Sequence, residues 1–239
     1  SETNMKLEKF FFKWRKFETP PLINGAPDYT KSQFKKRQQK YKKLAKELNS
    51  IDTTGWKHSW KADWMLIKAE MNGYDFNRRV LKSWERDPAF YQTIWMYQSD
   101  VPAHEGPVNH ALLEYWQYSL PLNKDSIKKI TKELNVISPL LAQARKNLTG
   151  NAKDLWIAGI RDIQSQIEDL NKIEKELLYH HKPKTIPNVI AAINNARTST
   201  NDFVKWLENQ SPKKNGPSGI GKENYTWYQK NVHLIPLTW

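Results

Sequence analysis

Apolar residues recur every three or four positions through residues 152–180 in one continuous seam. Its members are Trp156, Ile160, Ile163, Ile167, Leu170, Ile173 and Leu177. This spacing predicts an α-helix with one apolar face, because about 3.6 residues make a helical turn. A second seam of the same kind covers 189–207, after a turn at 182–187. Helices joined by a short turn pack side by side, so we predict a long antiparallel hairpin over 152–209.

Capping and turn signals predict further helices in the rest of the chain. An aspartate or asparagine before a helix accepts hydrogen bonds from its first N–H groups, and proline is tolerated at the first helical position. Asp87-Pro88, Asn123 or Asp125, and Ser138-Pro139 are predicted helix starts, Asn72-Gly73 a helix end, and Asp75 the cap of the next helix. No segment alternates polar and apolar residues as a half-buried strand does. The predicted fold class is therefore all-α, a multi-helix bundle of about ten helices.

Three tryptophans share one face of a predicted helix. Trp56, Trp60 and Trp64 continue into Ile67 and Met71 at helical spacing. Such a stripe could form a platform for a ligand. Large aromatic side chains more often anchor a hydrophobic core, and we expect that role here.

The composition excludes several classes of site. The chain has 239 residues and no cysteine, which excludes disulfides, thiolate nucleophiles and cysteine-based zinc sites. No apolar run approaches the ~20 residues that a membrane-spanning helix needs, so we expect no membrane span. The formal net charge is +13.

The densest basic segment is the helix predicted over 31–48. Its cationic residues include Lys35, Lys36, Arg37, Lys40, Lys42 and Lys43, beside a narrow apolar stripe of Phe34, Tyr41, Leu44 and Leu48. The segment could bind phosphates or an acidic partner, or it could be an ordinary solvated helix face. We favour the solvated face. No nucleic-acid-binding motif accompanies it, so nucleic acid is not an expected partner.

One short segment resembles a metal site. A zinc protease helix carries two histidines four residues apart, so that both imidazoles share one face. His104 and His110 are six residues apart, and Gly106-Pro107 interrupts any helix between them. We therefore predict no catalytic and no metal-binding residue. A loop site of His104, Glu105 and His110, with His180 or His181 as a further ligand, stays open as an alternative.

The segment 210–239 begins as a linker rich in Gly and Pro. Gly219 and Gly221 lack the third glycine and the Lys-Ser/Thr pair of phosphate-binding loops. If this segment binds a ligand, the candidates are Gly219, Gly221, Tyr225 and Tyr228. The spacing of Tyr225, Tyr228 and Val232 predicts a helix face. We expect the apolar residues 234–239 to be partly exposed or packed back on the bundle.

Four segments in order resemble one known family. They are Phe76–Tyr91 with its Asp-Pro-x-x-Tyr end, Ser138–Leu148, Ala191–Leu207, and Gly219–His233. Together they resemble the bacterial domain-of-unknown-function family 885, whose members look like zinc metallopeptidases of the gluzincin kind. The resemblance covers about residues 30–239.

The resemblance implies a function for the chain as part of a larger protein. The family's His-Glu-x-x-His-type helix lies downstream of the matched segments, so no catalytic residue is carried over and no cofactor is expected in this chain. Zinc, and a peptide substrate, would belong to a missing C-terminal catalytic part. The expected function is the non-catalytic N-terminal helical domain of a secreted or periplasmic metallopeptidase-like protein.

Two other functions remain open from the sequence. One is a stand-alone basic helical module that binds anionic partners. The other is a loop metalloenzyme using His104, Glu105 and His110. The expected organisation is an N-terminal extension and loop over 1–30, a helical domain over 31–209, and a linker with the start of a following segment over 210–239.

Overall fold

The structure is a computed structural model that describes residues 2–98 and 113–239, with side chains described from residue 5 onward. The described chain is mostly helical, as predicted, but it holds fewer α-helices than the ten that the sequence indicated. The α-helices are α1 (Glu2–Glu18), α2 (Lys31–Asn49), α3 (His58–Phe76), α4 (Ser83–Arg86), α5 (Lys124–Asn135), α6 (Ile137–Asn147), α7 (Lys153–His180), α8 (Pro187–Gln210) and α9 (Lys222–Asn231).

Short elements connect the helices. The helical ones are a π-helix, η1 (Asn77–Leu81), and the 3₁₀ turns η2 (Pro88–Tyr91), η3 (Tyr115–Gln117), η4 (Pro183–Thr185) and η5 (Ser211–Lys213). The strands are β1 (Leu22–Ile23), antiparallel to β2 (Ala26–Pro27), and β3 (Ile94–Trp95), parallel to β4 (Leu113–Glu114). Within the described residues, no helix is both long and apolar enough to cross a bilayer.

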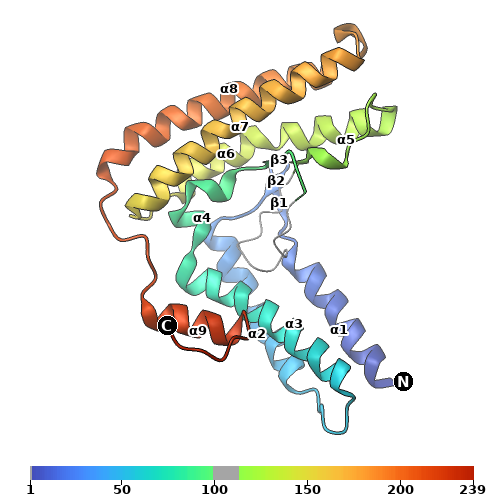
Figure 1. Ribbon diagram of the computed structural model, residues 1–239, viewed down its shortest axis with the longest axis vertical. Helices are drawn as coiled ribbons and strands as arrows, with labels where there is room; N and C mark the ends of the chain where they lie inside the picture. Colours follow the sequence, from blue (N-terminus) through green and yellow to red (C-terminus); the bar gives the residue numbers. More distant parts are fainter. Residues whose placement is uncertain (1, 99–112) are drawn as a thin grey trace.

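The helices form two groups (Figure 1). In this view α5, α6, α7 and α8 lie in the upper part of the molecule, and α1, α2, α3 and α9 lie below them. The described residues also hold two hydrophobic clusters, one for each group. The chain connects the groups through η1, α4 and η2, and the candidate site described below lies beside this connection.

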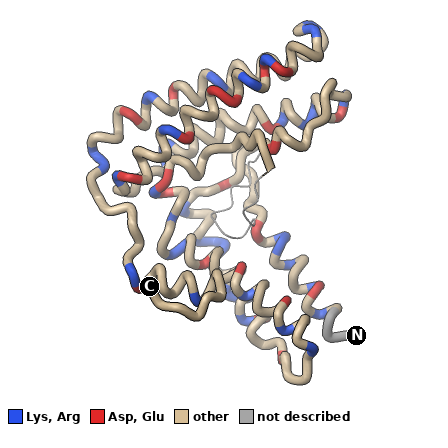
Figure 2. Tube along the Cα trace, in the orientation of Figure 1, with Lys and Arg blue, Asp and Glu red and all other residues tan. Residues whose placement is uncertain are grey.

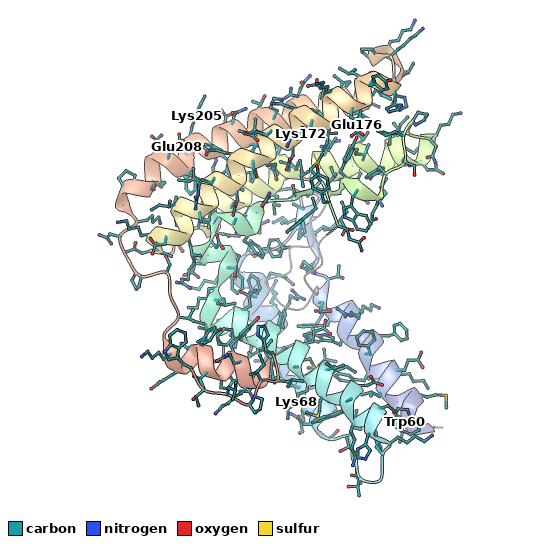
Figure 3. All side chains as sticks on the ribbon, in the orientation of Figure 1. Trp60, Lys68, Lys172, Glu176, Lys205 and Glu208 are labelled. Carbon is teal, nitrogen blue, oxygen red and sulfur yellow. The ribbon has the colours of Figure 1, made fainter. Side chains whose placement is uncertain are left out.

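The upper cluster is built from the two apolar seams. Trp156 and Leu170 of α7 and Phe203 of α8 are fully buried in it, and α5 and α6 both pack against α8. Charged side chains occupy the opposite faces, where Lys172, Glu176, Lys205 and Glu208 are exposed (Figure 3). Burial of one face and hydration of the other is what an amphipathic helix provides.

The lower cluster confirms the structural role of the tryptophan stripe. Trp56, Ile67 and Met71 are buried, and Trp60 and Trp64 are partly buried against the same cluster. The segment expected to be an N-terminal extension contributes α1, whose Trp14 has an exposed fraction of 0% in this cluster.

The predicted helix boundary at Asn72-Gly73 is wrong. Helix α3 runs through Gly73 to Phe76 and continues as η1, and Asp75 does not cap a new helix. Its carboxylate instead pairs with Arg78 at 3.0 Å and Arg79 at 2.6 Å. Ion pairs three and four residues apart stabilise a continuing helix, and Phe76 is buried against α9. Tertiary packing therefore overrides the local glycine signal.

The predicted long helix after Asp87-Pro88 is also wrong, although its start signal is correct. The Asp87 carboxylate accepts a hydrogen bond from the Ala89 N–H at 2.9 Å, but the helix is only the 3₁₀ turn η2. The Thr93 N–H then donates to buried Gln166 of α7 at 2.9 Å. The backbone beyond η2 is extended because its polar groups bond to α7 and β4 rather than to one another.

Candidate anion-binding groove

A groove lies between the first half of α2 and the segment formed by η1 and α4. Its volume is about 400 Å³. Its lining residues are Lys31, Phe34, Lys35, Gln38, Gln39, Arg78, Lys82, Trp84 and Glu85. We call it the α2–α4 groove.

The α2 wall follows from the way this helix begins. The Thr30 side chain caps the helix by accepting a hydrogen bond from the Gln33 N–H at 3.3 Å. Lys31, Lys35 and Gln38 then follow at intervals of four and three residues. This spacing places them on one helix face.

The opposite wall follows from an irregular backbone. The π-helix η1 ends at Lys82, a non-glycine residue in the left-handed region with φ of 46°. That conformation costs about 1–2 kcal/mol, and π-helical turns recur at functional sites. Asn77 holds the bend, because its side-chain oxygen accepts hydrogen bonds from the Ser83 N–H and hydroxyl. The bend brings Lys82 and Trp84 to the groove.

A pair of aromatic rings joins the two walls. The rings of Phe34 and Trp84 stack with their centroids 3.8 Å apart and their planes at 20°. The Trp84 side chain is buried, and Phe34 is partly buried. This pair gives the groove an apolar side.

The groove is strongly cationic. Lys31, Lys35, Arg78 and Lys82 line it together with one carboxylate, that of Glu85, and Arg78 is also paired with Asp75 outside the lining. Basic segments occur on the helices of both groups in Figure 2, so the net charge is not confined to α2. In the groove, cations from two separate elements line one recess. Convergence of like charges is unfavourable unless an anion offsets it.

Two polar atoms on the groove lining are buried without a hydrogen-bond partner in the described chain. They are Oε1 of Gln38 and Nε of Arg78. Arg78 uses a different nitrogen, Nη2, to bind Asp75 at 3.0 Å. An unsatisfied buried polar atom costs about 1–3 kcal/mol, so these two atoms lower the stability of the two walls.

The metal-site alternative falls mostly outside the described residues, so the structure does not test it. His104, Glu105 and His110 lie outside the described residues. His180 is exposed, and the Nε2 atom of His181 accepts a hydrogen bond from the Leu122 N–H at 2.9 Å. Across 2–98 and 113–239, no group of three or more His, Asp or Glu residues could hold a metal ion.

The glycine and tyrosine candidates lie at α9, away from the groove lining. Gly221 precedes α9 with φ of 83°, and Gly219 lies in open space. The ring of Tyr225 lies 5.6 Å from that of Trp239, and the ring of Tyr228 lies 4.9 Å from that of Phe76. Tyr228 thus helps to pack α9 against α3. The helix expected from the tyrosine spacing is confirmed.

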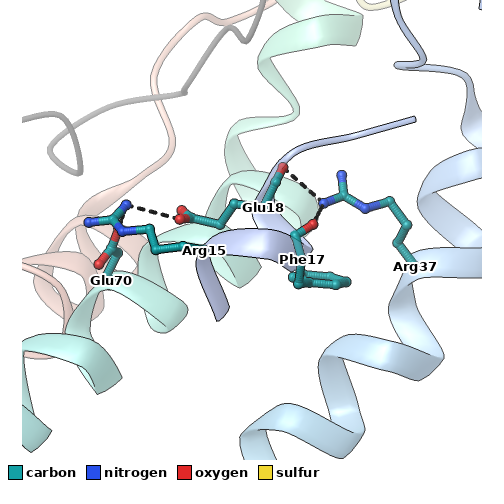
Figure 4. Close-up of polar contacts among 5 residues, drawn as sticks. All are labelled: Arg15, Phe17, Glu18, Arg37 and Glu70. Carbon is teal, nitrogen blue, oxygen red and sulfur yellow. Dashed lines mark hydrogen bonds and ion pairs between the residues drawn. The ribbon is translucent and has the colours of Figure 1, made fainter. Parts of the chain in front are cut away.

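One cation of the basic segment belongs to the core. Arg37 is 6% exposed, and its guanidinium donates to the backbone oxygens of Phe17 and Glu18 (Figure 4). It also lies over the Phe17 ring, 4.6 Å from the centroid. Arg37 is therefore neither part of a solvated helix face nor available to an anionic partner, because it anchors α2 to the end of α1.

A second charged cluster joins α1 to α3 (Figure 4). Arg15 bonds to the carboxylates of Glu18 at 2.9 Å and Glu70 at 2.5 Å. Burial and, to a lesser extent, the nearby Glu70 raise the pKa of Glu18 to about 7, although Arg15 opposes both. The cluster therefore holds a carboxyl group that is partly protonated near neutral pH.

Glu18→Gln is expected to stabilise the protein above pH 7 and to change little below pH 4.5. The pKa of Glu18 rises from 4.5 to about 7 on folding, so the native state binds the extra proton and loses stability as pH rises across that window. The gain at pH 8 should be about 1–2 kcal/mol, after allowance for solvent screening. Urea unfolding at pH 4 and pH 8 measures it. An equal effect at both pH values would contradict it.

The control is Glu47→Gln. This substitution removes an exposed ion pair with Lys13, and exposed pairs contribute little. It should leave the free energy of unfolding nearly unchanged at both pH values. If Glu47→Gln changed the free energy of unfolding as much as Glu18→Gln does, burial of the Glu18 carboxyl would not be the cause of the effect.

The sequence indicated the basic segment of α2 but not the groove. No sequence pattern identified Gln38, Arg78 or Lys82 as binding residues. The available signal was the helical spacing of Lys31, Lys35 and Gln38, which fixes one wall only.

Comparison of the chain with known protein families, with curated proteins and with solved structures finds no match.

Proposed function

We propose that this chain is a non-catalytic helical module that binds an anionic partner in the α2–α4 groove. One observation carries the proposal: four cationic side chains from two separate elements line one recess with an apolar side. An anion in the recess would relieve their mutual repulsion and would release counterions. Affinity for such a partner should therefore fall as salt concentration rises.

The double substitution Lys31→Gln and Lys35→Gln is expected to weaken heparin binding about tenfold at low salt. It should also flatten the salt dependence, because fewer counterions are released. Titration calorimetry over a salt series measures both quantities. The control is Lys42→Gln with Lys43→Gln, which removes the same charge from exposed positions of α2 outside the groove lining. If both pairs weaken binding equally, or if no binding occurs at low salt, the groove is not the site.

A second proposal follows from the resemblance to family 885. The chain, with α7 and α8 as an antiparallel hairpin, would be the helical part of a secreted or periplasmic zinc metallopeptidase-like protein and would form one side of its peptide-substrate cleft. One observation favours a partner domain: Leu237 and Trp239 are 64% and 69% exposed, and apolar surface favours burial. The coding sequence beyond Trp239 tests this proposal. A His-Glu-x-x-His helix is expected there, and a continuation without one contradicts it.

A further inference from the structure

We propose that α9 is an exchangeable latch: it detaches from α3 as one unit about a hinge at residues 219–221, and α9 of a second copy of the chain then occupies the face that it leaves. This inference is independent of the α2–α4 groove. Three observations support it: a fixed segment before the hinge, two glycines in open space, and a contact with α3 that is separate from both hydrophobic clusters.

The segment before the hinge is fixed. Residues 211–218 run from the end of α8 toward α9 (Figure 1) and form a strap against the start of α7. The Ser218 hydroxyl oxygen accepts hydrogen bonds from the N–H groups of Asp154 at 2.9 Å and Leu155 at 3.1 Å, and so caps α7. Arg86 of α4 donates to the Ser218 backbone oxygen at 2.9 Å. Detachment of α9 therefore begins after Ser218.

The hinge follows directly after this strap. Gly219 and Gly221 flank Ile220, and a Cβ atom added at either glycine would meet nothing within 4 Å. Gly221 has φ of 83°, in the left-handed region that glycine adopts without the strain of other residues. An uncrowded pair of glycines between a fixed strap and a helix is suited to absorb a large change in backbone angles.

The contact that holds α9 is separate from both hydrophobic clusters. None of the ten residues of α9 is buried. The ring of Phe76 lies 5.5 Å from that of Trp227 and 4.9 Å from that of Tyr228, and the Asn72 side chain donates to the Asn231 backbone oxygen at 3.0 Å. Within the described residues, Phe76 belongs to neither cluster. Helix α9 can therefore leave while both clusters stay intact, which is the condition for local opening below the global unfolding free energy.

The face that α9 leaves is complementary to α9 itself. Phe76 is 1% exposed with α9 in place, and an uncovered apolar face favours burial. A second copy presents the same rings and the same backbone acceptor, so every contact of the closed form can also form between two chains. Exchange of an identical element is a low-cost route to a dimer. The short tether gives α9 an effective concentration of about millimolar, so the closed monomer dominates in dilute solution.

Deletion of residues 219–221 from the full chain tests the exchange. It removes up to ~10 Å of reach, so α9 should no longer attain its own α3. The variant should be a dimer at concentrations where the unaltered chain is a monomer, as measured by sedimentation equilibrium. The control adds Trp227→Ala to the deletion, which removes the ring that stacks on Phe76 and should restore the monomer. A monomeric deletion variant, or a dimer that persists with Trp227→Ala, would overturn the second copy as the partner.

A labelled synthetic peptide of residues 219–239 tests the face with the hinge unaltered. The full chain with Trp227→Ala should bind it at least about tenfold more tightly than the unaltered chain, because its own α9 competes less. The matched control is Tyr225→Ala on the same helix, whose ring contacts Trp239 at 5.6 Å. This control should bind the peptide as weakly as the unaltered chain. Equal binding to the two variants, or no binding to either, would overturn the proposed face.

Hydrogen exchange of the unaltered chain tests the detachment itself. Amides of 222–231 should exchange at least about tenfold faster than those in the middle of α7, because α9 opens locally. The amides of Asp154 and Leu155, which the strap binds, should keep their protection. Equal protection of α9 and α7 would overturn the latch, and joint loss of protection in 154–155 and 222–231 would place the hinge before the strap and contradict the proposal.

Discussion

Trp14→Ala is expected to unfold the lower group of helices while α5–α8 stay folded. Trp14 is fully buried, and its ring lies 5.5 Å from that of Phe17 and 5.6 Å from that of Tyr74. Removal of a buried tryptophan costs about 3–5 kcal/mol, a large share of the stability of a typical domain. The indole N–H is buried without a partner in the described chain, so the loss is one of packing.

Hydrogen exchange resolved by segment measures this effect. Exchange should accelerate in 5–18, 31–49 and 58–76, and protection in 153–210 should persist, because the two groups have separate hydrophobic clusters. The matched control is Phe12→Ala on the same helix, where the side chain is 63% exposed. It should change little. Equal acceleration in both groups would show that the clusters unfold as one unit.

Gly159→Ala is expected to destabilise the protein by about 1–3 kcal/mol, although alanine is the better helix former. Gly159 lies near the start of α7, where the chain of η2 crosses it. A Cβ atom there would lie 2.8 Å from the Cβ of Pro88 and 3.0 Å from the Ala89 nitrogen. The proline ring is rigid, so η2 would have to move away from α7. The midpoint of urea unfolding should fall.

Gly219→Ala is the control for that prediction. A Cβ atom at Gly219 would meet nothing within 4 Å. The same chemical change should therefore be neutral or slightly stabilising, since alanine restricts the unfolded chain. A raised midpoint for Gly159→Ala would mean that η2 does not approach α7 as closely as the structure shows.

The sequence predicted the elements whose signals are local. The seams of α7 and α8 were recognisable because 3.6-residue periodicity follows from burial of one helix face. Asn123 and Asp125 were both recognisable as possible caps, and the structure selects Asn123, whose side chain accepts a hydrogen bond from the nearby Ser126 N–H. The core role of Trp56 followed from its size and spacing.

The predictions failed where a distant residue supplied the deciding contact. The turn η2 does not lengthen into a helix because Gln166, far along the chain, binds the Thr93 N–H. Helix α3 passes through Gly73 because Phe76 packs against Trp227 of α9, with the ring planes at 7°. No local propensity contains these contacts.

In the candidate site, too, local signals were predictable from the sequence and long-range contacts were not. The sequence by itself determined an amphipathic basic helix and the spacing that aligns Lys31, Lys35 and Gln38. Only the tertiary structure decided that Arg78, Lys82 and Trp84 face them and that Arg37 is a core residue. Helical spacing follows from bonds between near neighbours, which a sequence pattern records. Convergence of α2 with η1 and α4 depends on the Phe34–Trp84 stack, which joins residues far apart in the chain, and on the left-handed turn at Lys82, which no local propensity of lysine predicts.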